Sequence, residues 1–340
     1  MHDWLLRVWY GARPERWLLW PLSLLYRLIV AARRRAYASG VLRMHYPASP
    51  VVVVGNITAG GTGKTPLVIW LASRLAAEGR RPGIVTRGYG AHARAWPRLV
   101  SADCDPIEVG DESVLLARRC ACPVAAGPDR VAAARLLETG KVDVILADDG
   151  LQHYRLGRQF EIAVIDASRG FGNGFCLPAG PLREPATRLA DVDAVVENVA
   201  RGETASGDRI AMHVVAHVAV ALVSGERRPL ESFRGAPVHG VAGIGNPQRF
   251  FHQLAGFGLQ VIEHPLPDHA ELSDADIWFP DGGAVLMTEK DAVKCAGFAS
   301  AHHWYVPVEA RLSDADATGL MSRLHRSISD KSHEYHQVII

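Results

Sequence analysis

The sequence of 340 residues predicts an α/β fold in which a mainly parallel sheet is flanked by helices. The run Val51–Val54 is β-branched and apolar without alternation, which is typical of a strand buried on both faces. A glycine-rich turn follows, and then leucines spaced four residues apart, which is helical spacing. Further apolar segments, among them 143–148 and 161–166, are separated by helical patterns. This alternation favours parallel β-α-β units.

The turn after the first strand, residues 55–65, is the strongest functional motif. It matches G-x-x-x-x-G-K-[ST] at Gly63, Lys64 and Thr65, although Thr58 stands where the strict pattern has glycine. In such a loop the backbone surrounds nucleotide phosphates, the lysine reaches the β- and γ-phosphates, and the threonine hydroxyl binds Mg²⁺. The residues that we expect to contact the nucleotide are Thr58, Ala59, Gly60, Gly61, Thr62, Gly63, Lys64 and Thr65.

A second strand ends in two acids, because the apolar segment 142–147 runs into Asp148 and Asp149. Adjacent carboxylates repel one another unless a cation lies close by. In a nucleotide site, an acid at this position holds Mg²⁺ directly or through water. We therefore expect Thr65, Asp148 and Asp149 to hold Mg²⁺, the alternative being that the two acids only form a turn.

The expected nucleotide is ATP. A guanine-specific site would carry D-x-x-G and [NT]-K-x-D, but here Asp149 directly precedes Gly150, and in residues 288–291 the lysine and the aspartate are adjacent. A phosphate-binding loop with an acid at the end of a neighbouring strand indicates an NTPase or a kinase.

A kinase also needs a group that accepts or orients the proton of the attacking hydroxyl. The candidates in this chain are Asp111, Asp149, His153 and His269. Asp111 precedes a helical segment, so it either caps that helix or places a carboxylate toward the phosphates. The sequence supports both roles equally.

Other polar residues are candidates for the substrate side. Arg87 and Tyr89 follow a short strand, and open α/β sheets bind ligands at the carboxyl ends of strands, although an ordinary surface turn is equally consistent. Arg130 near the beginning of a helix is a poor complement to the helix dipole, which hints at an anionic partner, although a solvated surface arginine is the commoner case. In the proline- and glycine-rich loop 177–185, Arg183 and Glu184 either bind phosphate or pair with each other.

Residues 1–45 mix tryptophan, leucine and arginine, with eight arginines against Asp3 and Glu15. The apolar run 17–32 is interrupted by Pro21 and Arg27 and is shorter than the about 20 residues that span a bilayer. Tryptophans beside a basic flank are typical of a helix that lies in the membrane interface. We expect such a helix here, the alternative being a helix packed on the protein's own core.

Five segments follow from the pattern: an interfacial membrane region at 1–45, the nucleotide-binding core at 46–200, a two-stranded linker at 201–235, a smaller α/β domain at 236–328 and a loose tail at 329–340. The net charge of +1 gives no general attraction to nucleic acid, so no nucleic-acid partner is expected. Nothing in the pattern indicates an obligate protein partner. The five scattered cysteines are typical of buried thiols in a reducing compartment.

In its motifs and their order, the chain resembles the tetraacyldisaccharide 4′-kinases, the lipid A 4′-kinases of Gram-negative bacteria. The resemblance extends from the N-terminal segment to about Lys294. The motifs that carry it are residues 55–66 (GNITAGGTGKTP), 87–90 (RGYG), 109–112 (VGDE), 148–153 (DDGLQH), 180–185 (GPLREP) and 288–291 (TEKD).

This resemblance implies transfer of the ATP γ-phosphate to the 4′-hydroxyl of an acylated glucosamine disaccharide 1-phosphate, with Mg²⁺, at the cytoplasmic face of the inner membrane. It implies that Asp111 is the general base and that His269 assists it. It also implies a peripheral or monotopic attachment through the N-terminal helix. The further positions that it places in the active site are Arg130, Gln152, His153, Arg183 and Glu184, and Glu112 is expected to bind substrate.

Two other classes of function fit parts of the pattern. A regulatory ATPase recruited to a membrane would hydrolyse ATP without an acceptor sugar. A non-catalytic membrane scaffold would not need Lys64 or the acid pair, so their presence argues against it.

Overall fold

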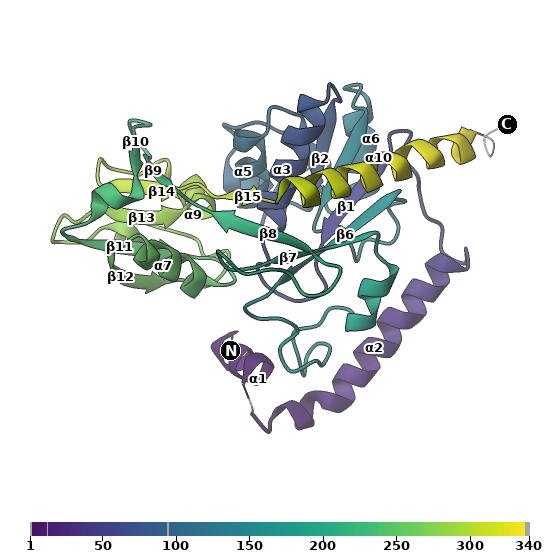
Figure 1. Cartoon of the computed structure of the whole chain (residues 1–340), viewed down its shortest axis with the longest axis horizontal. Helices are drawn as coiled ribbons and strands as arrows, with labels where there is room; N and C mark the ends of the chain where they lie inside the picture. Colours follow the sequence, from purple (N-terminus) through teal and green to yellow (C-terminus); the bar gives the residue numbers. More distant parts are fainter. Residues whose placement is uncertain (1, 12, 94, 337–340) are drawn as a thin grey trace.

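The computed structural model describes residues 2–11, 13–93 and 95–336. Within these residues the larger of two sheets has nine strands in the order β15-β8-β7-β6-β1-β5-β2-β4-β3 (Figure 1). Its strands are β1 (Val51–Gly55), β2 (Pro82–Thr86), β3 (Arg98–Val100), β4 (Val124–Ala126), β5 (Val144–Asp148), β6 (Phe160–Asp166), β7 (Ala194–Asn198), β8 (Ile210–Val215) and β15 (Glu309–Arg311).

The four valines form the centre of this sheet, since β1 pairs in parallel with β5 on one side and β6 on the other. Only β3 and β15, at the two edges, run antiparallel to their neighbours. A strand with neighbours on both sides and helices on both faces buries every residue, which explains why its sequence is apolar throughout. The predicted α/β class with a mainly parallel sheet is confirmed.

Helices cover both faces of this sheet. Val52 and Val54 point to the face covered by α3 (Lys64–Ala77), α5 (Asp111–Arg119) and α10 (Asp314–His336). Val51 and Val53 point to the opposite face, which is covered by α6 (Arg130–Glu138) and the loop after β5. The short elements α4 (Pro106–Val109) and η1 (Ala186–Asp191) lie in the connections.

The smaller sheet has the order β10-β9-β14-β13-β11-β12, and its last four strands are parallel. One face packs on α7 through Phe250, Phe251 and Leu254, and the other on α8 and α9. The elements are β9 (Val218–Ala221), β10 (Arg227–Pro229), η2 (Leu230–Phe233), β11 (Pro237–Ala242), α7 (Pro247–Gly256), β12 (Gln260–Pro265), α8 (Asp274–Ile277), β13 (Val285–Thr288), α9 (Glu289–Cys295) and β14 (His303–Val306).

The chain crosses between the sheets twice, from β8 to β9 and from β14 to β15. The predicted linker 201–235 therefore contributes β8 to the larger sheet and β9 and β10 to the smaller one. The predicted C-terminal domain, 236–328, also differs, because Leu320, Leu324 and Ile328 of α10 are buried against the larger sheet. This helix extends to His336, although the polar sequence after 328 suggested a loose tail, and residues 337–340 lie outside the described part.

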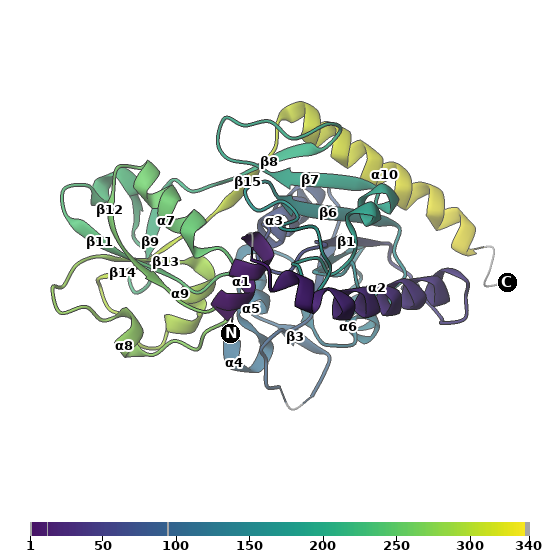
Figure 2. The same ribbon diagram turned by 90° about the horizontal axis from the view of Figure 1, so that it is seen from below.

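Two helices precede the larger sheet: α1 (His2–Tyr10) and α2 (Arg16–Ala38), which runs along one side of the molecule (Figures 1 and 2). Polar contacts hold α2 to the loop after β6, where Ser23 donates to the Cys176 carbonyl at 2.7 Å and Tyr26 donates to the Arg183 carbonyl at 3.0 Å. Its opposite side is apolar and exposed. Among the described helices, none combines the length and the apolar character that crossing a bilayer requires.

Candidate active site

A cavity of about 640 Å³ lies where loops of the two sheets meet. The larger sheet contributes the turn after β1, the ends of β2 and β5, and the beginning of α6, while the smaller sheet contributes the loops after β11, β12 and β13. Leu6 and Trp9 of α1 reach it as well. The predicted site residues on its wall are Ala59, Gly60, Gly61, Thr62, Gly63, Lys64, Thr65, Arg87, Tyr89, Glu112, Arg130, Asp148, Asp149, Arg183 and His269.

The turn after β1 leads directly into α3, so backbone N–H groups at the beginning of that helix face the cavity. Gly63 has φ 95°, a conformation that glycine adopts without cost. A Cβ at this position would lie 2.7 Å from Nδ2 of Asn198, which donates to the Thr62 carbonyl at 3.1 Å. The loop is therefore a preformed cradle for an anion. Thr58 is buried within it and does not line the cavity.

Asp148 ends β5 opposite this cradle. Its Oδ2 lies 3.5 Å from Thr65 Oγ1, while its Oδ1 is buried without a hydrogen-bond partner. Burial, together with the negative charge of Glu112, raises the pKa of Asp148 to about 7. An unpartnered carboxylate oxygen beside a threonine hydroxyl is a donor set that suits Mg²⁺. These residues therefore fit the cation that the sequence predicts.

Asp149 is held differently from its neighbour. Its backbone has φ 50°, and its carboxylate lies 3.4 Å from Lys64 Nζ and 3.0 Å from Arg183 Nη1. Burial alone would raise its pKa, but the positive charges of Lys64 and Arg183 hold the pKa of Asp149 far below the usual value. Asp149 is therefore ionised and keeps Lys64 and Arg183 at the cavity. Arg183 pairs with Asp149, so of the two roles predicted for it, pairing with Glu184 is wrong.

On the opposite wall, Oδ2 of Asp111 lies 3.3 Å from Nδ1 of His269. Asp111 does not cap α5, since Gly110 occupies the N-cap position and Asp111 is the first residue of the helix. The His269 ring packs against Tyr89 in a tilted arrangement, with 4.5 Å between the ring centroids. Burial raises the pKa of Asp111, but the contact with His269 and the charge of Lys290 outweigh it, so the pKa is lower than usual.

Lys290 organises this wall. Its Nζ lies 2.9 Å from Asp268 Oδ1, 3.1 Å from His269 Nε2 and 3.4 Å from Glu112 Oε1. A lysine only donates hydrogen bonds, so a neutral His269 carries its proton on Nδ1, facing Asp111. Because Glu112 belongs to α5 and Lys290 to α9, these contacts join the two sheets at the cavity.

The chain is similar to known proteins of one family. The family model LpxK, described as tetraacyldisaccharide-1-P 4′-kinase, matches residues 15–328. The chain belongs to this family. Tetraacyldisaccharide 4′-kinases from Nitrosococcus oceani and Alkalilimnicola ehrlichii are 51% and 53% identical to it, covering 96% and 92% of this chain and 96% of each relative.

A solved structure agrees with this assignment. The LpxK of Aquifex aeolicus, crystallised in complex with ATP, is 29% identical, with a TM-score of 0.75, and the match covers 92% of this chain and 99% of that one. The resemblance seen in the sequence motifs is thus confirmed. The chain is an ATP-dependent 4′-kinase of lipid A biosynthesis.

Three predicted site residues of this 4′-kinase lie behind the cavity wall. Glu184 is buried and accepts hydrogen bonds from Gln152 Nε2 at 2.8 Å and from Tyr154 at 2.6 Å. Gln152 also donates to the Asn56 carbonyl at 3.0 Å, which ties Glu184 to the turn after β1. Burial and the charge of Arg130 lower the pKa of His153 to about 4, so this ring is neutral at pH 7.

The sequence analysis missed several residues of the 4′-kinase site. Lys290 lay within the 288–291 motif without a role, and Asp268, Arg249 and Asn198 were not singled out, although all four line the cavity. The signal for Lys290 was available, because Thr288-Glu289-Lys290-Asp291 directly follows a buried strand. Arg249 gave no such signal, since only the approach of α7 to β7 brings it near Asn198.

The stability of the 4′-kinase should depend on pH through His269. Burial lowers the pKa of His269, but the contact with Asp111 outweighs it, so the pKa is raised above 6.5. The contribution of His269 to the free energy of unfolding is therefore fully present below pH 6.5, and it is lost as the pH rises through the raised pKa of the folded enzyme. For Asp111, whose pKa is lowered, stabilisation is present above pH 3.8 and is lost as the pH falls through the lowered value.

We therefore expect His269→Asn to destabilise the enzyme more at about pH 6 than at about pH 9, by about 1 kcal/mol or less because His269 is partly exposed to solvent. Asparagine tolerates the φ of 60° at this position. Urea denaturation at the two pH values measures the difference, with His252→Asn on the exposed side of α7 as the control. An equal loss at both pH values would contradict the prediction.

Proposed function

We propose that this 4′-kinase binds MgATP between the turn after β1 and the end of β5 and transfers the γ-phosphate to the 4′-hydroxyl of a tetraacyldisaccharide 1-phosphate. The observation that carries the proposal is that one cavity is lined by the phosphate cradle with Lys64 and, opposite it, by His269 with Asp111 behind. Phosphoryl transfer needs an anchored phosphate and a base within one site.

The chain's residues divide the work as follows. Residues 59–65 anchor the phosphates through backbone N–H groups, and Lys64 and Arg183 face the charge that develops on the transferred group. Thr65 and Asp148 are the residues that would hold Mg²⁺, with Asp149 close by. When bound, the metal neutralises charge on the phosphate oxygens.

The acceptor hydroxyl gives its proton to the Asp111–His269 pair. Asp111 is kept ionised by its lowered pKa and is the base of this pair, and it acts through His269, which lines the cavity in front of it. Lys290 fixes the imidazole from the other side. Arg87, Tyr89, Glu112 and Arg130 line the remaining walls and would contact substrate, whereas Gln152, His153 and Glu184 support the loops from behind.

The direct test measures ATP consumption with and without the acylated disaccharide 1-phosphate. We expect ADP formation only with the acceptor, accompanied by a mass gain of one phosphate on the disaccharide. Equal ATP hydrolysis without acceptor would favour a regulatory ATPase. If the protein does not bind ATP, the remaining explanation is a non-catalytic membrane scaffold.

The exposed side of α2 supports attachment to the cytoplasmic face of the inner membrane as a peripheral or monotopic protein. Leu18, Leu25 and Leu28 are 80%, 55% and 67% exposed, and Trp17 is 57% exposed. So much apolar surface on one helix, next to arginines, is typical of a helix that lies in a membrane interface. A lipid acceptor gives the enzyme a reason to be held there.

Replacing Leu18, Leu25 and Leu28 together by serine should weaken partitioning into anionic phospholipid vesicles at least about 10-fold, since less apolar area enters the bilayer. Co-sedimentation measures the effect. The control is Leu99→Ser, which removes a leucine on β3 that is as exposed as Leu25. Unchanged co-sedimentation of the triple variant would show that α2 does not face the membrane.

A further inference from the structure

Arg249 of α7 links the smaller sheet to the larger one through polar contacts that the mechanism above does not use. Its Nη2 donates a hydrogen bond to Oδ1 of Asn198, and its Nη1 lies 3.3 Å from Oδ1 of Asp166. Asp166 and Asn198 are the last residues of β6 and β7, and the two are paired in register. Arg249 therefore reaches the edge of the larger sheet at which the phosphate cradle lies.

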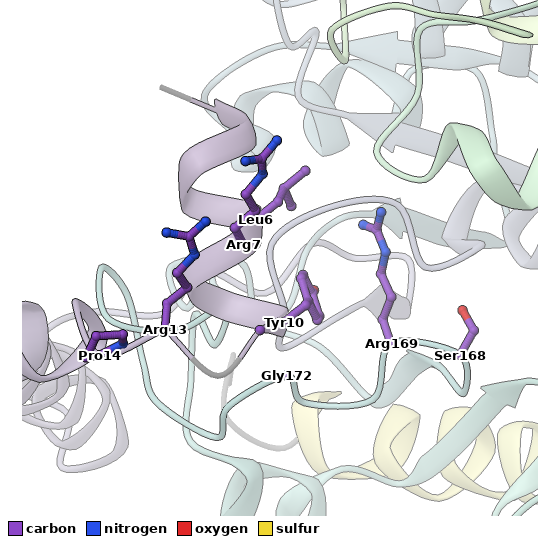
Figure 3. A pocket seen from close by; sticks show the side chains of 9 residues that line it. Leu6, Arg7, Tyr10, Arg13, Pro14, Ser168, Arg169 and Gly172 are labelled. Carbon is purple, nitrogen blue, oxygen red and sulfur yellow. The ribbon is translucent and has the colours of Figure 1, made fainter.

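The negative charge of Asp166 holds Arg249 at this edge. Asp166 is buried, and among the residues whose side chains the structure describes, Arg249 is the cation within ion-pair distance of it. Arg169, in the loop after β6, lies instead beside the ring of Tyr10, with its guanidinium carbon 5.3 Å from the ring centre (Figure 3). The Ser168 hydroxyl donates to Asp166 at 2.7 Å and fixes the carboxylate. Breaking such a buried pair from either side is costly, so Arg249 is well anchored.

The contact with Arg249 determines which way the Asn198 amide points. A guanidinium only donates hydrogen bonds, so the amide oxygen of Asn198 must face Arg249. The amide nitrogen then faces the cradle and donates to the Thr62 carbonyl at 3.1 Å. The reversed amide would place donor against donor at Arg249 and acceptor against acceptor at Thr62. Arg249 therefore selects the orientation of Asn198 that binds the cradle.

Asn198 in turn orients one peptide unit of the cradle, the unit that joins Thr62 to Gly63. Because this unit is planar and trans, its carbonyl and its N–H point in opposite directions. Anchoring the Thr62 carbonyl to Asn198 therefore holds the Gly63 N–H on the side away from Asn198, and Gly63 lines the nucleotide cavity. Glycine permits many backbone orientations, so an external contact is what keeps this N–H in place.

The first turn of α7 also packs directly on the cradle. A Cβ on Gly245 would lie 2.5 Å from the Gly61 nitrogen, so the two loops are in close contact. Farther along the helix, Gln253 donates to the Val214 carbonyl of β8 at 3.4 Å. Arg249 lies between these two contacts and is part of a continuous interface. The position of α7 and the shape of the cradle are therefore linked.

We propose that Arg249 is a positioning residue for the nucleotide phosphates and that it acts through Asn198 on the peptide between Thr62 and Gly63. The inference rests on the proposed binding of the phosphates at residues 59–65. A cradle that is held in its binding shape before the nucleotide arrives loses less conformational freedom on binding, and its affinity is higher. Because Arg249 belongs to α7, the smaller sheet contributes to this affinity through a residue that acts on the cradle and not on the nucleotide.

The test is a double-mutant cycle on nucleotide affinity, measured by calorimetry with Mg²⁺ and without acceptor. Arg249→Met should weaken the binding of ADP and of ATP by the same factor, about 10-fold, because the cradle is less ordered. In the Asn198→Ala background, the same substitution should change either affinity by less than about twofold, because its route to the cradle is gone.

The control is Arg228→Met, which removes another arginine of the smaller sheet, one that pairs with Glu226 and does not line the cavity. It should bind both nucleotides as the wild type does. Thermal unfolding checks that each variant folds. If Arg249→Met does not fold, Arg249→Lys takes its place in the cycle, since lysine keeps a positive charge beside Asp166 but lacks the planar fork that also reaches Asn198.

The assignment would be overturned by unchanged affinities in the Arg249 variant. A loss confined to ATP, or losses that add in the double variant, would overturn it as well, since Arg249 would then act on the nucleotide itself. An equal loss in Arg228→Met would mean a general weakening of the smaller sheet. The proposed function fails separately: a wild type that binds nucleotide but transfers no phosphate contradicts that function, while the binding cycle still decides the role of Arg249.

Discussion

Replacing Asp111 by asparagine should lower kcat about 10²- to 10⁴-fold, because the Asp111–His269 pair that takes the proton of the acceptor hydroxyl loses its carboxylate. ATP binding should change little, since Asp111 lies behind His269 and does not line the phosphate cradle. Single-turnover phosphate transfer with saturating acceptor measures the loss, and nucleotide affinity is measured separately by calorimetry.

The control for this variant is Asp208→Asn, which removes a carboxylate in an exposed loop. Asparagine nearly preserves the volume of the buried side chain, so the Asp111 variant should fold. Circular dichroism and thermal unfolding check that it does. Turnover of a folded Asp111→Asn enzyme within about threefold of the wild type would remove Asp111 from the mechanism.

Replacing Lys64 by methionine should lower kcat/KM for ATP about 10²- to 10³-fold, because the γ-phosphate loses a positive charge that faces it in the transition state. The loss has a second source. Lys64 lies 3.4 Å from Asp149, so its removal leaves a partly buried carboxylate with only Arg183 as a close partner. Steady-state kinetics with varied ATP measure the first effect, and thermal unfolding measures the second.

The matched control is Lys141→Asn. Lys141 is exposed and has φ 59°, which asparagine accommodates, so the variant removes the same charge without strain. Unchanged ATP kinetics in Lys64→Met would contradict the assignment of residues 59–65 to the phosphates.

The sequence was most informative where the structure of a segment depends only on residues within that segment. The valines of β1, the glycines of the turn and the leucines of α3 follow from burial and from local backbone preferences, so the nucleotide half of the cavity could be predicted in order. The packing of α10 could not be predicted. Its apolar residues indicate a helix with a buried side, but only the tertiary structure shows that this side packs against the larger sheet rather than the smaller one.

The site shows the same division. Lys64, Asp148 and Asp149 were identified because each sits at a strand end or in a motif whose chemistry is local. Lys290 was missed as a site residue because its importance comes from three partners, Glu112, Asp268 and His269, that the sequence separates widely.

The pairing of β8 with β15 sets Val215 opposite Glu309. The chain thus leaves the larger sheet after β8 and returns to it at β15, directly beside β8, so the smaller sheet is inserted into a hairpin of the larger one. Excising the stretch between those two residues and closing the gap with a tight turn would keep every strand pairing of the larger sheet. Such a deletion would remove His269 and Lys290 together with the smaller sheet and would leave all residues of the phosphate cradle in the chain.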